Sequence, residues 1–128
     1  MRSMITYIVA GNPNTPEKVL RKLAESGDSR IRRHVAENEA VTAGLLELLA
    51  WDSDPEVRVA AVSNRRCPRY LVEELLRTGD NQTLFLLAME KWAPLDVLGV
   101  LAESENPFIS FRARETLTIK TRSVPVLN

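Results

Sequence analysis

The sequence contains little cysteine and few aromatic residues. Among its 128 residues there is one cysteine, Cys67, with only three Phe, two Tyr and two Trp. A single cysteine excludes an internal disulfide and any metal site built from several cysteines. Because aromatic residues are scarce, Leu, Val and Ala must build most of the core.

An excess of charge of one sign and long apolar runs are also absent. Lys and Arg number 17, as do Asp and Glu, so the net charge is zero and gives the chain no general attraction to nucleic acid or anionic lipid. No apolar run approaches the roughly 20 residues that cross a bilayer, and the apolar stretch near the N-terminus is too short for a secretory signal. We therefore expect no membrane association and a cytoplasmic location.

The sequence does contain an internal repeat. Shifting the chain by 26 residues superposes its apolar positions on one another without gaps. Three sets of equivalent positions show the period: Leu20, Leu46, Val72 and Leu98; Leu23, Leu49, Leu75 and Leu101; and Val9, Val35, Ala61, Leu87 and Ala113. So many coincidences at one spacing identify a repeat protein.

Each unit is predicted to hold a longer helix followed by a shorter one. In the longer helix, apolar residues recur at i, i+1, i+4 and i+5, which places them on one helix face. Proline marks the first turn of this helix, at Pro16, Pro68 and Pro94. Thr15 is the expected N-cap of the first copy, and Gly27 and Gly79 are expected in the left-handed conformation after the last turn.

The shorter helix is predicted to begin at a capping residue and to end at an asparagine. The expected N-caps carry side chains that accept hydrogen bonds: Asp28, Asp54, Asp80 and Asn106. The helix end falls near Asn12, Asn38 or Asn64, a residue type that tolerates the left-handed conformation.

Counting both types predicts nine helices. The longer helices cover about 16–26, 42–52, 68–78 and 94–104, and the shorter ones about 4–11, 29–37, 55–63, 81–90 and 107–117. Since one helix pair cannot bury both of its faces, we expect about four and a half units to stack into an all-α solenoid over residues 1–117. Residues 118–128 break the period and contain Pro125, so we expect an irregular C-terminal cap or tail there.

Two junctions between units carry a specific pattern. The first reads VAGNPNTP over residues 9–16 and precedes Leu20 and Leu23, and the second reads DPEVR over residues 54–58. Together they resemble the leucine-rich repeat variant (LRV) family, bacterial relatives of the HEAT and armadillo solenoids, over about residues 5–115. The resemblance implies a right-handed α-α superhelix and no catalytic activity.

The sequence departs from this family in two ways. The founding type of the family joins its repeats to a cysteine-rich iron–sulfur segment, and a single cysteine cannot ligate such a cluster. We therefore expect no iron–sulfur cluster and no other cofactor. The Asn-Pro signature is kept only at Asn12-Pro13, because Asn38 and Asn64 lack the proline and Glu90 replaces the asparagine.

Two residues of reactive type are interpreted as structural. His34 has no second histidine as a partner, so we interpret it as part of the packing rather than as a catalytic or metal-binding group. Cys67 lies near Arg65, Arg66 and Arg69, whose charges could lower the pKa of its thiol and make it a nucleophile. Because no second Cys or His completes a mechanism, an incidental loop thiol is the preferred interpretation.

Two arginines follow the capping aspartates at a fixed distance. Arg32 and Arg58 each lie four residues after an aspartate, Asp28 and Asp54 respectively. An N-cap aspartate with an arginine at i+4 forms a helix-stabilising pair. We therefore assign these residues to structure, within a helix or between repeats, in preference to ligand binding.

A basic loop suggests an alternative function. Arg65, Arg66 and Arg69 could together grip a phosphate backbone, with help from the basic C-terminus. The charge of successive units changes sign along the chain, however, and no basic stripe follows the repeat. Nucleic-acid binding is therefore the second hypothesis.

Three aromatic residues interrupt the pattern of the repeat. Trp51 holds a position where the sister units carry charge, Trp92 lies in a loop, and Phe85 shares its position with Arg33. A large aromatic residue at such a position marks a partner-binding surface or packing against a terminal cap. Partner binding is slightly favoured for Trp51, and the two interpretations are equally open for Trp92.

No motif of an enzyme accompanies these features. The sequence has no phosphate-binding loop, no metal-ligand spacing and no nucleophile motif. The first hypothesis is therefore a non-catalytic scaffold that binds a protein or peptide. The alternative is a HEAT-like module that binds nucleic acid, and the oligomeric state is open at this point.

Overall fold

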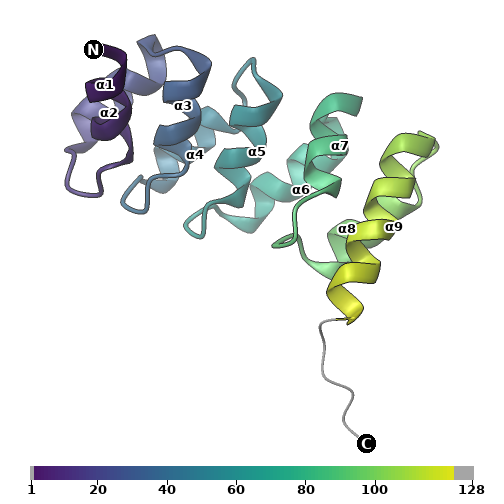
Figure 1. Ribbon diagram of the computed structural model, residues 1–128. Coiled ribbons are helices and arrows are strands. Elements are labelled where there is room, and N and C mark those ends of the chain that lie inside the picture. The colour runs from purple at the N-terminus through teal and green to yellow at the C-terminus, as the bar shows by residue number, and fades with distance from the viewer. Residues whose placement is uncertain (1, 123–128) are drawn as a thin grey trace, which may run out of the picture. The chain divides into compact units, whose positions relative to one another are not determined.

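The computed structural model describes residues 2–122, which form nine helices and no strand (Figure 1). The helices are α1 (Arg2–Gly11), α2 (Glu17–Ser26), α3 (Ser29–Ala36), α4 (Ala43–Leu49), α5 (Pro55–Ser63), α6 (Arg69–Thr78), α7 (Asn81–Ala88), α8 (Leu95–Ala102) and α9 (Pro107–Arg122). The predicted all-α class and the predicted number of helices are confirmed. The predicted lengths are wrong in two units, because α4 with 7 residues is shorter than α5 with 9, and α8 with 8 residues is shorter than α9 with 16.

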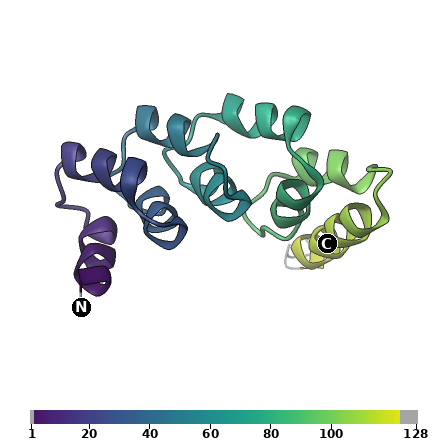
Figure 2. The ribbon, with the colours of Figure 1, turned by 90° about the horizontal axis from the view of Figure 1, so that it is seen from above.

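The helices belong to two compact units, Met1–Val72 and Glu73–Asn128, and α6 crosses the boundary between them. In the first unit α1, α3 and α5 pack side by side, and α2 and α4 form a second layer (Figure 2). In the second unit α9 packs against both α7 and α8. Within each unit, consecutive helix pairs therefore stack as a helical repeat requires.

Aliphatic side chains at the repeated positions form the core of each unit. Val35 and Ala61 of the first unit are fully buried, as are Leu87 and Ala113 of the second. The equivalent residue of the first repeat, Val9, is only partly buried, because no earlier repeat among the described residues covers it. The 26-residue period therefore locates the core correctly.

Polar side chains cap the second helix of each unit, α3, α5, α7 and α9, as expected. Each expected cap accepts a hydrogen bond from a first-turn N–H at 2.8–3.0 Å: Asp28, Asp54, Asp80 and Asn106. The expectation for Thr15 is wrong, since its hydroxyl donates to the carbonyl oxygen of Val9 at 2.6 Å. Pro16 occupies the cap position of α2 without any side-chain hydrogen bond.

The expected left-handed glycines and asparagines are not found. No residue of the described part of the chain has a positive φ, and Gly27 has φ −73° and ψ 161°. A Cβ atom at Gly27 would lie 2.6 Å from the carbonyl oxygen of Leu23, and one at Gly79 would lie 2.5 Å from that of Leu75. These glycines are therefore needed because the backbone approaches closely, and not for a left-handed turn.

The last helix continues beyond its predicted end at residue 117. α9 runs to Arg122, and the hydroxyls of Thr118 and Thr121 donate to carbonyl oxygens four residues earlier. The ammonium of Lys120 also bonds the carbonyl oxygen of Ala93. β-Branched residues lower helix propensity only slightly, so these contacts and the packing of α9 outweigh it. The rest of the predicted tail, 123–128, lies outside the described residues.

Candidate partner-binding surfaces

Asparagine side chains join consecutive repeats of the first unit. Asn38 is 2% exposed, and its Nδ2 donates to the carbonyl oxygens of Ala10 at 2.8 Å and Asn12 at 3.0 Å. Its Oδ1 accepts a bond from the N–H of Ala40 at 2.8 Å. One amide therefore satisfies two carbonyls of the preceding repeat and the turn that follows it.

Asn64 makes the same set of bonds one repeat later. Its Nδ2 donates to the carbonyl oxygens of Ala36 at 2.8 Å and Asn38 at 2.9 Å, and its Oδ1 accepts from the N–H of Arg66 at 2.9 Å. Sequence reasoning missed this role, although the 26-residue spacing of the asparagines was its signal. These side chains are structural and are not free to bind a ligand.

An ion pair links α3 to the turn after α4. The Nε of Arg32 lies 2.8 Å from Oδ2 of Asp52, and its Nη2 lies 3.0 Å from Oδ1. Burial opposes ionisation of Asp52, but hydrogen bonds from Arg32 and from the N–H of Asp54 outweigh it and lower the pKa of the carboxyl. The ladder between repeats that the sequence suggested for Arg32 is thus formed with Asp52, while Asp28 caps α3.

Cys67 does not have the properties of a reactive thiol. Its side chain is partly buried, and burial raises the pKa of the thiol to about 11. The thiol is therefore protonated near neutral pH, and the suggested lowering of its pKa by neighbouring arginines is wrong. Burial disfavours the thiolate more than nearby cations favour it.

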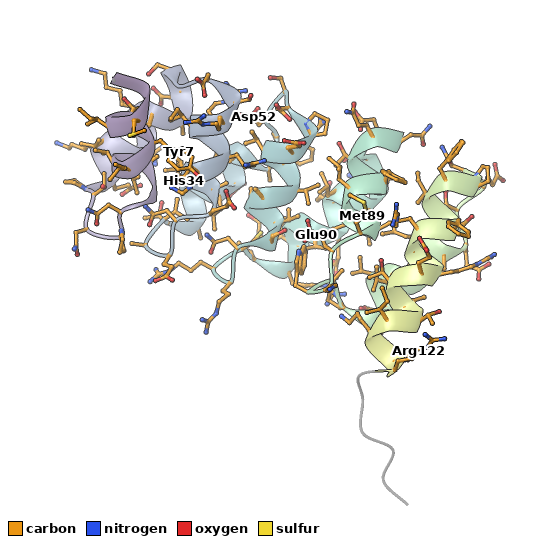
Figure 3. The ribbon with its side chains drawn as sticks, viewed as in Figure 1. Tyr7, His34, Asp52, Met89, Glu90 and Arg122 are labelled. Atoms are coloured by element: carbon orange, nitrogen blue, oxygen red, sulfur yellow. The ribbon has the colours of Figure 1, made fainter. Side chains whose placement is uncertain are left out.

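His34 is a packing residue, as the sequence analysis preferred. Its ring stacks on that of Tyr7, with the ring centroids 3.8 Å apart and the planes inclined by 2° (Figure 3). A Cβ atom at Gly11 would lie 2.1 Å from Nε2 of His34, so the absence of a side chain there makes room for the imidazole. The guanidinium carbon of Arg30 lies 4.8 Å from the centroid of the Tyr7 ring. α3 thus holds α1 through its His and Arg side chains.

The basic loop is exposed. Arg65 and Arg66 project from the segment between α5 and α6, and Arg69 is the exposed first residue of α6. The structure therefore keeps the three arginines in one short stretch of the surface.

Trp51 is exposed, as are two residues of α4. The side chain of Trp51 is 53% exposed and lies in the turn two residues after the end of α4, and that of Leu48, in the last turn of α4, is 47% exposed. Gly44 lies on the same face, and a Cβ atom there would meet nothing within 4 Å. These three residues follow the spacing i, i+4 and i+7, and we call them the α4 surface.

α6 makes a polar contact with Glu47 of α4, the residue next to Leu48 in the sequence. Tyr70 is 49% exposed and its hydroxyl donates to Oε2 of Glu47 at 2.9 Å, which raises the pKa of the phenol. α4 therefore presents apolar groups beside a phenol that is already oriented by the protein. Such a mixture of aromatic, aliphatic and polar groups is typical of binding surfaces.

The other two aromatic candidates are less exposed. Trp92, in the loop after α7, is 36% exposed. Phe85 is partly buried, and the guanidinium carbon of Arg112 lies 5.6 Å from its ring centroid. Phe85 is therefore used in packing within the second unit, and Trp51 is the most exposed of the three.

The second unit also has an open cavity of about 300 Å³. Its lining combines apolar and charged side chains: Met89, Lys91, Arg112, Glu115, Thr116 and Ile119. The guanidinium of Arg112 is paired with Glu115 at 3.3 Å. Because Arg112 is already held by Glu115 and by the ring of Phe85, we assign it to packing.

The described residues contain neither a membrane-spanning helix nor a cluster of metal-binding side chains. No helix of that part of the chain is long and apolar enough to span a bilayer. The same residues contain no group of three or more His, Cys, Asp or Glu side chains placed to hold a metal ion.

Comparison with known proteins identifies the repeat. The family model of the leucine rich repeat variant domain matches residues 5–65. No curated protein and no solved structure matches the chain. The matched segment includes Asn12, Asn38 and Asn64, the residues whose backbone and side chains join the repeats of the first unit. The resemblance inferred from the sequence is thus confirmed over residues 5–65, which match the leucine rich repeat variant domain and form part of an all-helical repeat fold.

Proposed function

We propose that this protein is a non-catalytic scaffold that binds a protein or peptide through the α4 surface, Gly44, Leu48 and Trp51. The observation that carries the proposal is the 53% exposure of Trp51. The equivalent residue of the preceding repeat is Glu25, which is also exposed. Tryptophan is costly to expose and is enriched among the residues that dominate interfaces.

The glycine of the α4 surface supports the same proposal. A glycine in the middle of a helix costs about 0.5–1 kcal/mol relative to alanine, and Gly44, in the first turn of α4, should cost less than that. Gly44 has open space where a side chain would lie, so no contact within the first unit requires it. A partner that approaches the helix backbone closely would require it.

We also propose that the protein has no catalytic activity. The repeat family and the all-helical fold support a role without catalysis, and the neutral thiol of Cys67 supports it further. A cytoplasmic location is part of the proposal and has its support in the near-absence of cysteine.

Replacement of Trp51 by alanine tests the proposal. Partners captured from a lysate of the source cells by the wild-type protein are identified, and the most abundant is then titrated against each variant. We expect Trp51→Ala to change the free energy of unfolding by less than about 1 kcal/mol. The same variant should weaken binding of the partner by at least about 2 kcal/mol, or about thirtyfold in Kd.

Two control variants make the result specific. Trp92→Ala removes a second partly exposed indole and should leave binding unchanged. Gly44→Ala should stabilise the helix but weaken binding, a combination that a purely structural role for Gly44 would not produce. A large loss of thermal stability in Trp51→Ala would show instead that the indole belongs to the core and would refute the proposal.

The same experiment separates the alternative function. Binding that disappears after nuclease treatment, falls steeply with salt and is lost in the Arg65→Ala/Arg66→Ala double variant would favour nucleic acid. Binding that survives both treatments and depends on Trp51 favours the scaffold.

A further inference from the structure

We infer that the protein associates head to tail with a second copy of itself, with Phe111 on α9 of one copy packing between Met4 and Ile8 on α1 of the next. The inference does not depend on the α4 surface. It follows from a contact that recurs at three places along the repeat: between α1 and α3, between α3 and α5, and between α7 and α9.

The first example of this contact joins α1 to α3. We call Tyr7 on α1 the projecting residue, and the two residues of α3 that contact its ring the receivers. The ring of His34 stacks on that of Tyr7 with the centroids 3.8 Å apart, and the guanidinium carbon of Arg30 lies 4.8 Å from the Tyr7 ring centroid. Arg30 and His34 are separated by four residues and therefore lie on the same helix face. One projecting side chain of α1 thus contacts two receivers on α3.

The next repeat of the first unit makes the same contact with different chemistry. Arg33 is 26 residues after Tyr7, and its Nη1 lies 3.2 Å from Oε2 of Glu56, which is 26 residues after Arg30. The projecting residue and its receiver have changed from aromatic and cationic to cationic and anionic. Their positions in the repeat have not changed.

The second unit gives a third example. Phe85, at the position equivalent to Tyr7, lies under the guanidinium of Arg112, at the position equivalent to His34. In all three pairs, α1–α3, α3–α5 and α7–α9, the projecting residue belongs to the first helix and the receiver to the second. In each case the two side chains are chemically matched.

The end of the described chain carries a projecting residue without a receiver among the described residues. Phe111 on α9 is four 26-residue repeats after Tyr7 and is 65% exposed. α1 carries receivers for which the described residues supply no projecting residue. Met4 and Ile8 on α1 are equivalent to Arg30 and His34, and their side chains are 64% and 60% exposed.

The core position of α1 is uncovered as well. Ile5 is 63% exposed, whereas the equivalent residues Ile31, Val57 and Ile109 are at most 3% exposed. α1 thus presents three exposed apolar side chains, Met4, Ile5 and Ile8, and apolar surface of this kind is suited to be covered by a partner.

A second copy fits this end better than an unrelated partner. Receiver and projecting residue lie on the same chain at the spacing of whole repeats, and both are apolar, as the matching of the other junctions demands. A methionine sulfur and an isoleucine side chain are favourable neighbours for a phenyl ring. Association through two different surfaces is heterologous, so each added copy leaves one free end of each kind unless a ring closes.

Two charge-introducing variants test this inference. The mass of the wild-type protein, measured by sedimentation equilibrium at concentrations up to about 1 mM, should rise above the 14.4 kDa of the monomer. We expect a weak contact with a Kd of about 1 mM. Phe111→Asp removes the projecting residue and Ile8→Asp removes a receiver, so each variant alone should remain monomeric. We expect an association constant reduced by at least about tenfold, because a carboxylate would be buried against apolar groups.

Mixing the two variants gives the decisive measurement. Phe111→Asp keeps an intact α1 and Ile8→Asp keeps an intact α9, so an equimolar mixture should form a 1:1 dimer that grows no further. An interface in which α1 pairs with α1, or α9 with α9, would instead leave one variant self-associating on its own. Self-association of one variant on its own would overturn the inference. So would a mixture, or a wild-type protein, that stays monomeric.

Phe108→Asp is the matched control. Phe108 also lies on α9 and is 73% exposed. It occupies the position of Arg30, which is a receiver for α1 and not a projecting residue. This variant should associate like the wild type, and loss of association in it would also overturn the inference. Thermal melts verify that each variant is folded, and Phe111→Ser and Ile8→Ser replace any that is not.

Discussion

The two units of the molecule satisfy the same backbone requirement with different side chains. In the first unit, Asn38 and Asn64 each donate to a carbonyl oxygen 28 residues earlier, at 2.8 Å in both cases. In the second unit Thr116 stands at the equivalent position and donates to the carbonyl oxygen of Ala88, also 28 residues earlier, at 2.6 Å. The repeat thus specifies a donor at this place and not a residue type.

The difference lies in how much each side chain can do. An asparagine amide has two donors and an acceptor, so Asn38 and Asn64 each reach two carbonyls of the preceding repeat and one N–H of their own turn. A threonine hydroxyl has one donor, and that of Thr116 also lies 3.1 Å from the carbonyl oxygen of Arg112 in its own helix. A junction made by asparagine is therefore joined by more bonds.

This difference coincides with the extent of the family match. The match covers residues 5–65 and ends one residue after Asn64. Beyond it the position of the asparagine is held by Glu90 and then by Thr116. The second unit keeps the fold of the repeat because its aliphatic core persists, although the polar signature of the family is lost.

The largest predicted effect compares the cores of the units. Leu49 of the first unit is 1% exposed, and Leu101, its equivalent in the second, is 3% exposed. Leu49→Ala should lower the free energy of unfolding by about 2–5 kcal/mol, and Leu101→Ala should agree with it within about 1 kcal/mol. Urea denaturation followed by circular dichroism measures both. A neutral Leu49→Ala would refute the assignment of the core positions, and a much smaller cost at Leu101 would show looser packing in the second unit.

The next effect concerns the asparagine junction. Asn38→Ala leaves two carbonyl oxygens without their donor, so we expect a loss of about 2–4 kcal/mol in the free energy of unfolding. Asn38→Asp keeps the shape of the side chain but not its N–H groups, and should cost at least as much. Asn12→Ala is the matched control, because the Asn12 side chain is exposed and accepts one bond, from the N–H of Asn14. Equal costs at Asn12 and Asn38 would contradict the junction role.

The smallest effect is expected at the equivalent position of the second unit. Thr116→Val keeps the shape of the side chain and removes its hydroxyl, so the carbonyl oxygen of Ala88 loses one donor. We expect a loss of about 1 kcal/mol, the usual net contribution of one hydrogen bond. A cost as large as that of Asn38→Ala would show that the two junctions are equally strong despite their different numbers of bonds.

Much of the fold was determined by the sequence itself. The 26-residue period, the capping aspartates and the prolines located the helices and the buried positions, because each is a local signal within one or two turns. The predicted end of α9 was wrong because it depends on a contact between residues distant in the sequence. β-Branched residues after 117 weaken a helix locally, but the contact of Lys120 with Ala93 could not be seen along the chain.

Only the tertiary structure decided what the polar and aromatic residues do. The sequence suggested that Asn38 ends a helix, that Arg32 pairs with Asp28 or with another repeat, and that Trp51 is unusual. Stacking of the repeats gave Asn38 its carbonyl partners 26 and 28 residues away, brought Arg32 against Asp52, and left the indole of Trp51 exposed. Helix formation depends on neighbours along the chain, whereas these contacts depend on how far one repeat is displaced and rotated against the next, which no local pattern encodes.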